Sequence, residues 1–229
     1  MADVATGVIF DVDGTLVDTT FIHTVCWADA LGTAGQVVPM ARIHHAIGMG
    51  SDELLDHLLP DRDRSSDETV ITAHLALYRQ YWGRLCAFDK AADLLRACAE
   101  RGHKVVLASS ASTDELAALK DALDADDVID IATSSSDADS GKPHPDILTA
   151  ALEQSGLEPG SAVFVGDSVW DAEAAAKANI AFVAVTCGGT PAGELRDAGA
   201  LEVWRDPAEL IERLDESVIA KLSRTGHGR

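Results

Sequence analysis

From residue 88 to residue 221, short apolar segments alternate with longer segments whose apolar residues recur at helical spacing. The apolar segments are residues 103–108, 128–133, 161–165, 181–185 and 201–204, and residues 4–10 form a sixth. Continuous apolar runs of this length are typical of strands that are buried on both faces. Strands that alternate with helices form a parallel sheet covered by helices on both sides. The sequence therefore predicts an α/β fold with a doubly wound parallel sheet.

A helical segment interrupts this alternation after the first strand. Residues 21–85 show four helical stretches and no strand pattern: residues 21–31, 40–47, 52–59 and 67–85. We therefore expect two domains, an α/β core of residues 1–17 and 87–229 and a small all-α cap of residues 18–86. Further helices are expected at residues 91–101, 113–123, 145–156, 171–178 and 207–221. The tail from Ser223 is expected to fray.

The chain is strongly acidic, with 38 Asp and Glu, 18 Lys and Arg, and a formal net charge of −20. This charge disfavours nucleic acid and anionic membrane surfaces as partners. No apolar run reaches the roughly 20 residues of a membrane span, and the N-terminus has no basic region typical of a signal peptide. Four widely spaced cysteines fit free thiols in a reducing compartment. We expect a cytoplasmic protein and, without a long exposed apolar face, a monomer.

Carboxylates gather where the first predicted strand ends. The stretch FDVDGTLVDTT places Asp11, Asp13 and Asp18 within eight positions. Close like charges repel and buried unpaired carboxylates are costly, so a cation or a special chemistry should compensate them. In an open α/β sheet, the carboxyl ends of the strands form one edge, where ligands bind. Further polar residues are predicted at that edge: Ser109, Ser110, Gly141, Lys142, Gly166, Asp167 and Asp171.

These side chains suit the binding of a metal ion and a phosphoryl group. Three carboxylates are hard oxygen donors of the kind that Mg²⁺ prefers: Asp11, Asp13 and Asp167. A divalent ion would remove their mutual repulsion. Lys142 supplies a positive charge, Ser109 a hydroxyl donor, and Gly14 a tight turn with backbone N–H groups facing the same place. One carboxylate can then act as a nucleophile and another as a general acid and base.

The polar stretches resemble the motifs of the haloacid dehalogenase superfamily, most of whose members are phosphatases. DVDGTLVDT is similar to the first motif, LASSAS to the second, GKPHPD to the third and VGDSVWD to the fourth. Any one of these stretches occurs by chance, but all four in order are highly specific. The match covers nearly the whole chain and fits the subgroup with a helical cap, which includes phosphoglycolate phosphatases and β-phosphoglucomutases.

The resemblance implies roles for the carboxylates. Asp11 corresponds to the nucleophile and Asp13 to the general acid and base. Mg²⁺ would bind to Asp11, to the backbone carbonyl of Asp13 and to Asp167, and Asp171 would orient the metal site. Asp171 also suits the N-cap of a helix that starts at residue 172. The implied function is Mg²⁺-dependent hydrolysis of a small soluble phosphomonoester through an aspartyl-phosphate.

The resemblance also implies residues that bind the phosphorylated metabolite. Ser109 and Lys142 would hold the transferring phosphoryl group. Ser110, which ranks below Ser109, would contribute its backbone N–H. Gly14 belongs to the same phosphate-binding turn. His23 faces the site in the family, although an ordinary position on a helix face explains a histidine equally well.

Two alternatives to a phosphatase stay open, a phosphomutase of the β-phosphoglucomutase type and a non-catalytic phosphate-binding module. The mutase carries a cap arginine shortly after a glycine, where this chain reads Gly48-Met49-Gly50-Ser51. The presence of Asp13 counts against dehalogenation, because dehalogenases of this family lack that second aspartate. Residues 21–85 contain no lysine, which excludes hydrolysis of phosphonoacetaldehyde through a Schiff base.

Three conspicuous residues have no assigned role. His44 and His45 invite a metal interpretation, but adjacent helical positions do not share a face, so joint chelation is not expected. Trp170 lies between Asp167 and Asp171 in the sequence, where it could line the substrate entrance or pack under a helix.

Overall fold

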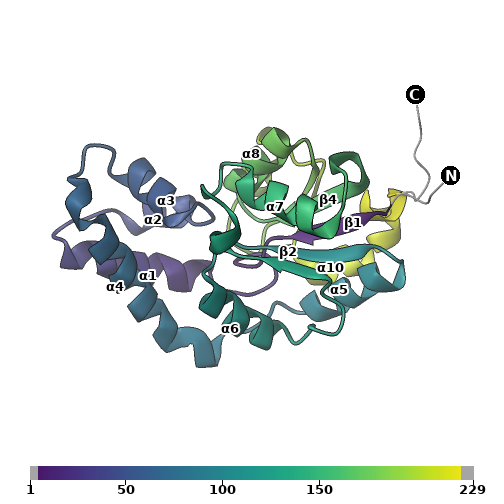
Figure 1. Cartoon of the computed structure of the whole chain (residues 1–229), viewed down its shortest axis with the longest axis horizontal. Helices are drawn as coiled ribbons and strands as arrows, with labels where there is room; N and C mark the ends of the chain where they lie inside the picture. The colour runs from purple at the N-terminus through teal and green to yellow at the C-terminus, as the bar shows by residue number, and fades with distance from the viewer. Residues whose placement is uncertain (1–4, 223–229) are drawn as a thin grey trace.

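A computed structural model describes residues 5–222, and within them the chain forms a six-stranded, all-parallel sheet beside a group of helices (Figure 1). The strand order is β3-β2-β1-β4-β5-β6, so the first strand is central. The strands are β1 (Gly7–Phe10), β2 (Lys104–Ala108), β3 (Ile131–Thr133), β4 (Ala162–Gly166), β5 (Ala181–Val185) and β6 (Glu202–Trp204). The predicted α/β fold with a doubly wound parallel sheet is confirmed.

Each face of the sheet packs against its own layer of helices. Alternate side chains of a strand point to opposite faces, so Phe10 joins one hydrophobic cluster and Ile9 the other. The first cluster contains side chains of α5 (Ala91–Glu100), α6 (Thr113–Leu123) and α10 (Pro207–Glu212). The second contains side chains of α7 (Asp146–Ser155), α8 (Val169–Ala178) and α9 (Ala192–Asp197). The central strands are therefore fully buried, as their unbroken apolar sequence predicts.

The helices between β1 and α5 have a hydrophobic cluster of their own. They are α1 (Thr20–Thr33), α2 (Met40–Ala46), α3 (Ser51–Leu58) and α4 (Asp67–Tyr78). Their buried side chains include Trp27, Ile43 and Leu54. The chain leaves and re-enters the sheet domain at one place, where Asp18 N–H donates to Cys86 O at 3.0 Å. These contacts support the proposed boundaries of the cap, residues 18–86, and we call this helical part the cap below.

Several predicted elements differ from the observed ones. The predicted helix 67–85 ends as an α-helix at Tyr78 and continues as a 3₁₀ segment, Arg79–Arg84. The predicted closing helix 207–221 ends at Glu212, and two short 3₁₀ turns follow it. Helix α9 was not predicted, because Gly193 weakens the helical pattern of its six residues. The predicted first strand begins at residue 4, which lies outside the described residues, as does the tail from Ser223; the observed strand begins at Gly7.

Two further observations concern cysteines and membranes. The cysteines Cys26, Cys86, Cys98 and Cys187 are all free, as predicted from their spacing. Within residues 5–222, no helix combines the length and the apolar character that crossing a membrane requires.

Candidate active site

Carboxylates that are far apart in the sequence lie together at the carboxyl edge of the sheet. Because β1 pairs with β4, the residues that follow these strands, Asp11 and Asp167, are neighbours. One carboxylate oxygen each of Asp11, Asp167 and Asp171 lies within 4.8 Å of the other two. The hydroxyl of Thr15 lies 3.2 Å from both Asp11 Oδ2 and Asp167 Oδ1 and so bridges the two side chains. The structure thus brings these three predicted site residues together.

One lysine lies between these carboxylates. Lys142 is only 1% exposed, and its Nζ lies 2.5 Å from Asp11 Oδ1 and 2.7 Å from Asp171 Oδ1. Burial alone would lower the pKa of Lys142, but the two carboxylates outweigh burial and raise it. The lysine is therefore charged, and one positive charge faces three buried carboxyl groups.

Burial and the neighbouring carboxylates raise the pKa of two carboxyl groups. Burial raises the pKa of Asp11 to about 7, although Lys142 opposes the shift. Burial, together with the nearby Asp171 and Asp11, raises the pKa of Asp167 well above its usual value. A second cation would relieve this repulsion, and every donor in the group is a hard oxygen. The residues therefore fit a divalent ion such as Mg²⁺.

Asp171 organises the loop that carries Asp167. Its Oδ2 accepts hydrogen bonds from the backbone N–H groups of Asp167 (3.2 Å) and Ser168 (3.0 Å) and from the Ser168 hydroxyl (2.7 Å). The Ser168 hydroxyl accepts in turn from the Asp171 N–H at 3.1 Å. Ser168 is the N-cap of α8, so the prediction of Asp171 as N-cap was wrong. The helix begins earlier, at Val169, which places Asp171 in its first turn.

Two glycines leave room for the carboxylate of Asp167. Gly14 has a φ of +80°, and a Cβ at this position would lie 2.6 Å from Asp167 Oδ2. A Cβ at Gly188 would overlap the same oxygen. The tight turn predicted at Gly14 is present, and any side chain there would displace Asp167.

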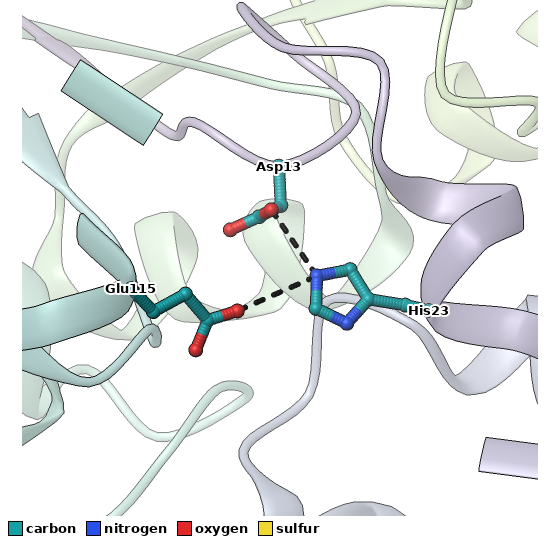
Figure 2. A group of neighbouring side chains, drawn as sticks. All are labelled: Asp13, His23 and Glu115. Carbon is teal, nitrogen blue, oxygen red and sulfur yellow. Dashed lines mark hydrogen bonds and ion pairs between the residues drawn. The ribbon is translucent and has the colours of Figure 1, made fainter. Parts of the chain in front are cut away.

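Asp13 has a different environment from Asp11, although only one residue separates them. Its Oδ1 accepts from the Thr19 hydroxyl at 2.7 Å and lies 3.3 Å from His23 Nε2. Figure 2 shows this histidine between two carboxylates, since its Nε2 also lies 3.6 Å from Glu115 Oε1. Burial alone would raise the pKa of Asp13, but the bonds from His23 and Thr19 hold it below its usual value. The pKa values of the two aspartates are therefore shifted in opposite directions.

His23 is held in place by the aromatic side chains of the cap. Its ring stacks on Tyr78 at 3.9 Å between centroids, and its Nδ1 lies 3.1 Å from His74 Nε2. The His74 ring stacks in turn on Trp27 at 4.2 Å. Burial alone would lower the pKa of His23, but Asp13 and Glu115 raise it. Of the two interpretations of His23, the structure places the ring at the site.

Glu115 and His74 are site residues that the sequence interpretation missed. Glu115 lies on α6, where it forms a capping box with Ser112, and it is only 4% exposed. A serine followed three residues later by glutamate predicts a helix start. This capping role explains Glu115 from the sequence alone, so nothing in the sequence points to its contact with His23. The signal that could have found His74 is its spacing: it lies four residues after Val70 and four before Tyr78, and all three side chains are buried on one face of α4.

The burial of Glu115 leads to a prediction for stability. Burial raises the pKa of Glu115 from 4.5 to about 7, so the folded state binds this proton more tightly than the unfolded state. The resulting stabilisation is complete below pH 4.5 and is lost as the pH rises through about 7. Glu115→Gln should therefore match the wild type near pH 4.5. At pH 8 its free energy of unfolding should be higher by roughly 1–3 kcal/mol.

Urea denaturation in the presence of a chelator, at both pH values, measures this difference. The matched control is Glu100→Gln, which removes the same charge from an exposed position on α5 and should change stability little at either pH. A Glu115→Gln variant that is less stable than the wild type at pH 8 would contradict the prediction. It would mean that the ion pair with His23 outweighs the burial of Glu115.

The two serines after β2 have different positions. The Ser109 hydroxyl is fully buried and accepts from the Ala111 N–H at 3.1 Å. Ser110 lines the cavity described below, and its buried hydroxyl has no hydrogen-bond partner within residues 5–222. On the sequence alone, Ser109 ranks above Ser110. Of the two, Ser110 is the one that lines the cavity, while the Ser109 hydroxyl keeps its own proton available for donation.

A cavity of about 340 Å³ lies between the sheet domain and the cap. The sheet domain contributes Asp11, Asp13, Ser110 and Lys142 to its walls, and the cap contributes side chains of α1, α3 and α4. The cap meets the loop before Lys142 closely. Gly50 N–H donates to Lys142 O at 3.2 Å, and Glu53 Oε1 accepts from Gly141 N–H at 2.9 Å. The cavity is therefore bounded on one side by Asp11 and Asp13 and on the other by the cap.

The residues without an assigned role join the cap to the sheet domain. His44 Nε2 lies 3.2 Å from Gly188 O, and His45 Nε2 lies 3.3 Å from Glu194 Oε2. The indole N–H of Trp170 donates to His45 O at 2.8 Å, and its ring contacts His57. The two adjacent histidines point to different partners, as expected from their spacing.

Comparison with known proteins agrees with this geometry. A sequence model of haloacid dehalogenase-like hydrolases matches residues 5–179. The phosphoglycolate phosphatase of Escherichia coli (strain K12) is 30% identical over 209 residues, which cover 80% of this chain and 81% of that protein. The crystal structure of a hydrolase from Pseudomonas syringae shares 32% identity at a TM-score of 0.88, and covers 93% of this chain and 98% of its own.

A more distant structure shares the fold alone. CbbY from Rhodobacter sphaeroides, solved in complex with phosphate, has a TM-score of 0.72 at 22% identity, and covers 92% of this chain and 96% of its own. The family match spans more than half of the chain and includes β1, the cap and β4. The chain therefore belongs to the haloacid dehalogenase-like hydrolase family and is an enzyme, a hydrolase of the phosphatase type.

Proposed function

We propose that this enzyme is a Mg²⁺-dependent phosphatase that hydrolyses a small phosphomonoester through a phosphorylated Asp11. The observation that carries this proposal is the contrast between two aspartates at the end of β1. Asp11 lies within 2.5 Å of a buried lysine and beside Asp167, whereas Asp13 pairs with His23. A nucleophile and a separate proton carrier are what a two-step phosphoryl transfer needs.

The carboxylates of Asp11 and Asp167 would hold Mg²⁺, with Asp171 orienting the loop of Asp167 and the backbone carbonyl of Asp13 as the ligand that the family resemblance implies. When bound, the ion would neutralise charge on the carboxylates and on the phosphoryl oxygens. Lys142 contributes the resident positive charge and keeps Asp11 oriented. The family resemblance assigns Ser109 to the phosphoryl group. Ser110, which lines the cavity and whose buried hydroxyl has no partner within residues 5–222, is a second hydrogen-bond donor for it.

In the first step, a carboxylate oxygen of Asp11 attacks phosphorus and the bond from phosphorus to the substrate oxygen breaks. The leaving alkoxide takes a proton from the Asp13–His23 pair. This pair is suited to hold that proton, because Asp13 raises the pKa of His23 against the effect of burial, and His23 Nε2 lies 3.3 Å from Asp13 Oδ1. The products of this step are the free alcohol and an acyl phosphate on Asp11.

In the second step, water attacks the phosphorus of the acyl phosphate. Asp13 accepts the proton of this water, so the pair returns to its starting protonation state. The bond between phosphorus and the Asp11 oxygen breaks, which releases inorganic phosphate and the free carboxylate. Both steps use the same placement of charge, and placement supplies most of the acceleration in phosphoryl transfer.

Metal removal tests the proposed function. We expect phosphate release from p-nitrophenyl phosphate with Mg²⁺ present, its loss after treatment with EDTA, and its return when Mg²⁺ is restored. A sugar 1-phosphate, followed for both isomerisation and free phosphate, serves as the second substrate. Conversion to an isomer without phosphate release would point to a phosphomutase. The absence of turnover on every ester, with the protein folded and Mg²⁺ present, would point to a non-catalytic module.

A further inference from the structure

Beyond Asp11, Asp13 and Lys142, the charged side chains on the walls of the cavity are acidic, and they lie among serines and apolar residues. Helix α3 contributes Asp52 and Glu53, α6 contributes Glu115, and the loop before Lys142 contributes Asp139. A carboxylate accepts hydrogen bonds and donates none when ionised. In the proposed reaction the phosphoryl group binds at Asp11 and Lys142, so the part of the substrate that leaves as an alcohol would occupy the rest of the cavity, between these side chains.

Basic side chains are scarce on the same walls. Within residues 5–222, Lys142 is the one lysine or arginine that lines the cavity, and both of its ion pairs are to site carboxylates. The arginines of the cap have contacts elsewhere. Arg42 donates to Leu58 O, Arg62 and Arg64 pair with Asp56, and Arg79 and Arg84 lie over the rings of Trp82 and Tyr81.

Other sources of positive charge at the cavity are already balanced. His23 lies between Asp13 and Glu115 (Figure 2). Burial holds the pKa of His74 well below its usual value, so this imidazole is neutral. The N-terminus of α3 faces the cavity, but its first turn carries Asp52 and Glu53, which offset the positive end of the helix dipole.

We propose that the leaving group of the substrate carries no anionic group and binds these walls by donating hydrogen bonds, as a hydroxyl or an ammonium does. This inference rests on the proposed phosphatase function. A cavity of about 340 Å³ also limits the substrate to a small ester. An ester such as 2-phosphoglycolate, the compound in the name of the Escherichia coli relative, would place its carboxylate among like charges.

Three esters of nearly equal size isolate the charge of the leaving group. They are 2-phosphoglycolate with a carboxylate, 2-hydroxyethyl phosphate with a neutral hydroxyl, and O-phosphoethanolamine with an ammonium. With Mg²⁺ present, kcat/KM for 2-phosphoglycolate should be lower than for the better of the other two by about tenfold or more. The hydroxyl and ammonium esters show which donor the enzyme prefers. An equal or higher kcat/KM for 2-phosphoglycolate would overturn the inference.

A pair of variants tests whether the substrate preference comes from the charge of the cavity walls or from the net charge of the protein. Asp52→Lys places a cation on the wall, and Asp61→Lys makes the same change of charge at an exposed cap residue that does not line the cavity. Asp52→Lys should raise kcat/KM for 2-phosphoglycolate relative to 2-hydroxyethyl phosphate by about tenfold, whereas Asp61→Lys should leave the ratio unchanged. Equal effects of the two variants would contradict the assignment of the wall.

The inference and the proposed function can fail separately. Turnover with a preference for 2-phosphoglycolate would overturn the inference and keep the phosphatase. No phosphate release from the three esters or from p-nitrophenyl phosphate would overturn the proposed function, and the inference with it. Calorimetric binding of the three esters to the Asp11→Asn variant gives the same ranking without chemistry, and tighter binding of 2-phosphoglycolate would count against the inference.

Discussion

Replacing Asp11 with asparagine is expected to lower phosphate release by roughly four to six orders of magnitude. Asparagine has the size of aspartate, so the contacts of residue 11 with Thr15 and Lys142 can be kept. The amide oxygen, however, is a poor nucleophile, and the acyl phosphate cannot form. The loss should appear in kcat with every phosphomonoester tested, because the missing group reacts with the phosphorus that all of them share.

The fold of this variant should survive. Burial raises the pKa of Asp11 to about 7, which means that its ionised form destabilises the folded state above that pH. Removing the charge also removes repulsion from Asp167 and Asp171, so the melting temperature should change by no more than a few degrees, about 5 °C. Asp61→Asn removes the same charge from an exposed cap residue and should keep full activity. Normal turnover by folded Asp11→Asn would refute the nucleophile assignment.

The parallel sheet explains how much of the site the sequence could predict. Asp11 and Asp167 each follow a buried strand, and those strands pair in register from Gly7 and Ala162 onward. Once both strands are identified, the fold rules place their ends at one edge. The convergence of Asp11 and Asp167 therefore needed only the strand pattern and the polar residues that end it, without knowledge of how the helices pack. Lys142 instead lies in the loop before α7, so its place at this edge depends on where that helix begins.

The partners of Asp13 could not be predicted in this way, because they depend on how the cap packs against the sheet domain. His23 lies on a cap helix and Glu115 on a helix of the sheet domain, and their 3.6 Å contact exists only across that interface. Local sequence explains Glu115 as part of a capping box, and it explains His74 as one of the buried residues on a single face of α4. The same limitation left the roles of His45 and Trp170 open, since their hydrogen bond also crosses the interface.

The removal of Lys142 is expected to be the most destabilising single change at the site. Lys142→Met keeps much of the side-chain volume but leaves Asp11, Asp167 and Asp171 buried without their positive partner. Loss of one member of a buried ion pair typically lowers the free energy of unfolding by about 3–5 kcal/mol. Urea denaturation at pH 8 in the presence of a chelator should show a loss of this size.

The pH dependence distinguishes uncompensated charge from a packing defect. Lys142 lowers the pKa values of Asp11 and Asp167. Without it these two pKa values rise further in the folded state, so the folded state holds their protons more tightly than the unfolded state. Stability is then favoured at low pH and lost as the pH rises, which means that the deficit of Lys142→Met should be smaller at pH 5 than at pH 8. Lys120→Met removes an exposed ion pair with Asp126 and should cost about 1 kcal/mol or less at both pH values. A deficit for Lys142→Met that is equally large at both pH values would show that lost packing, and not the three unpaired carboxylates, causes the instability.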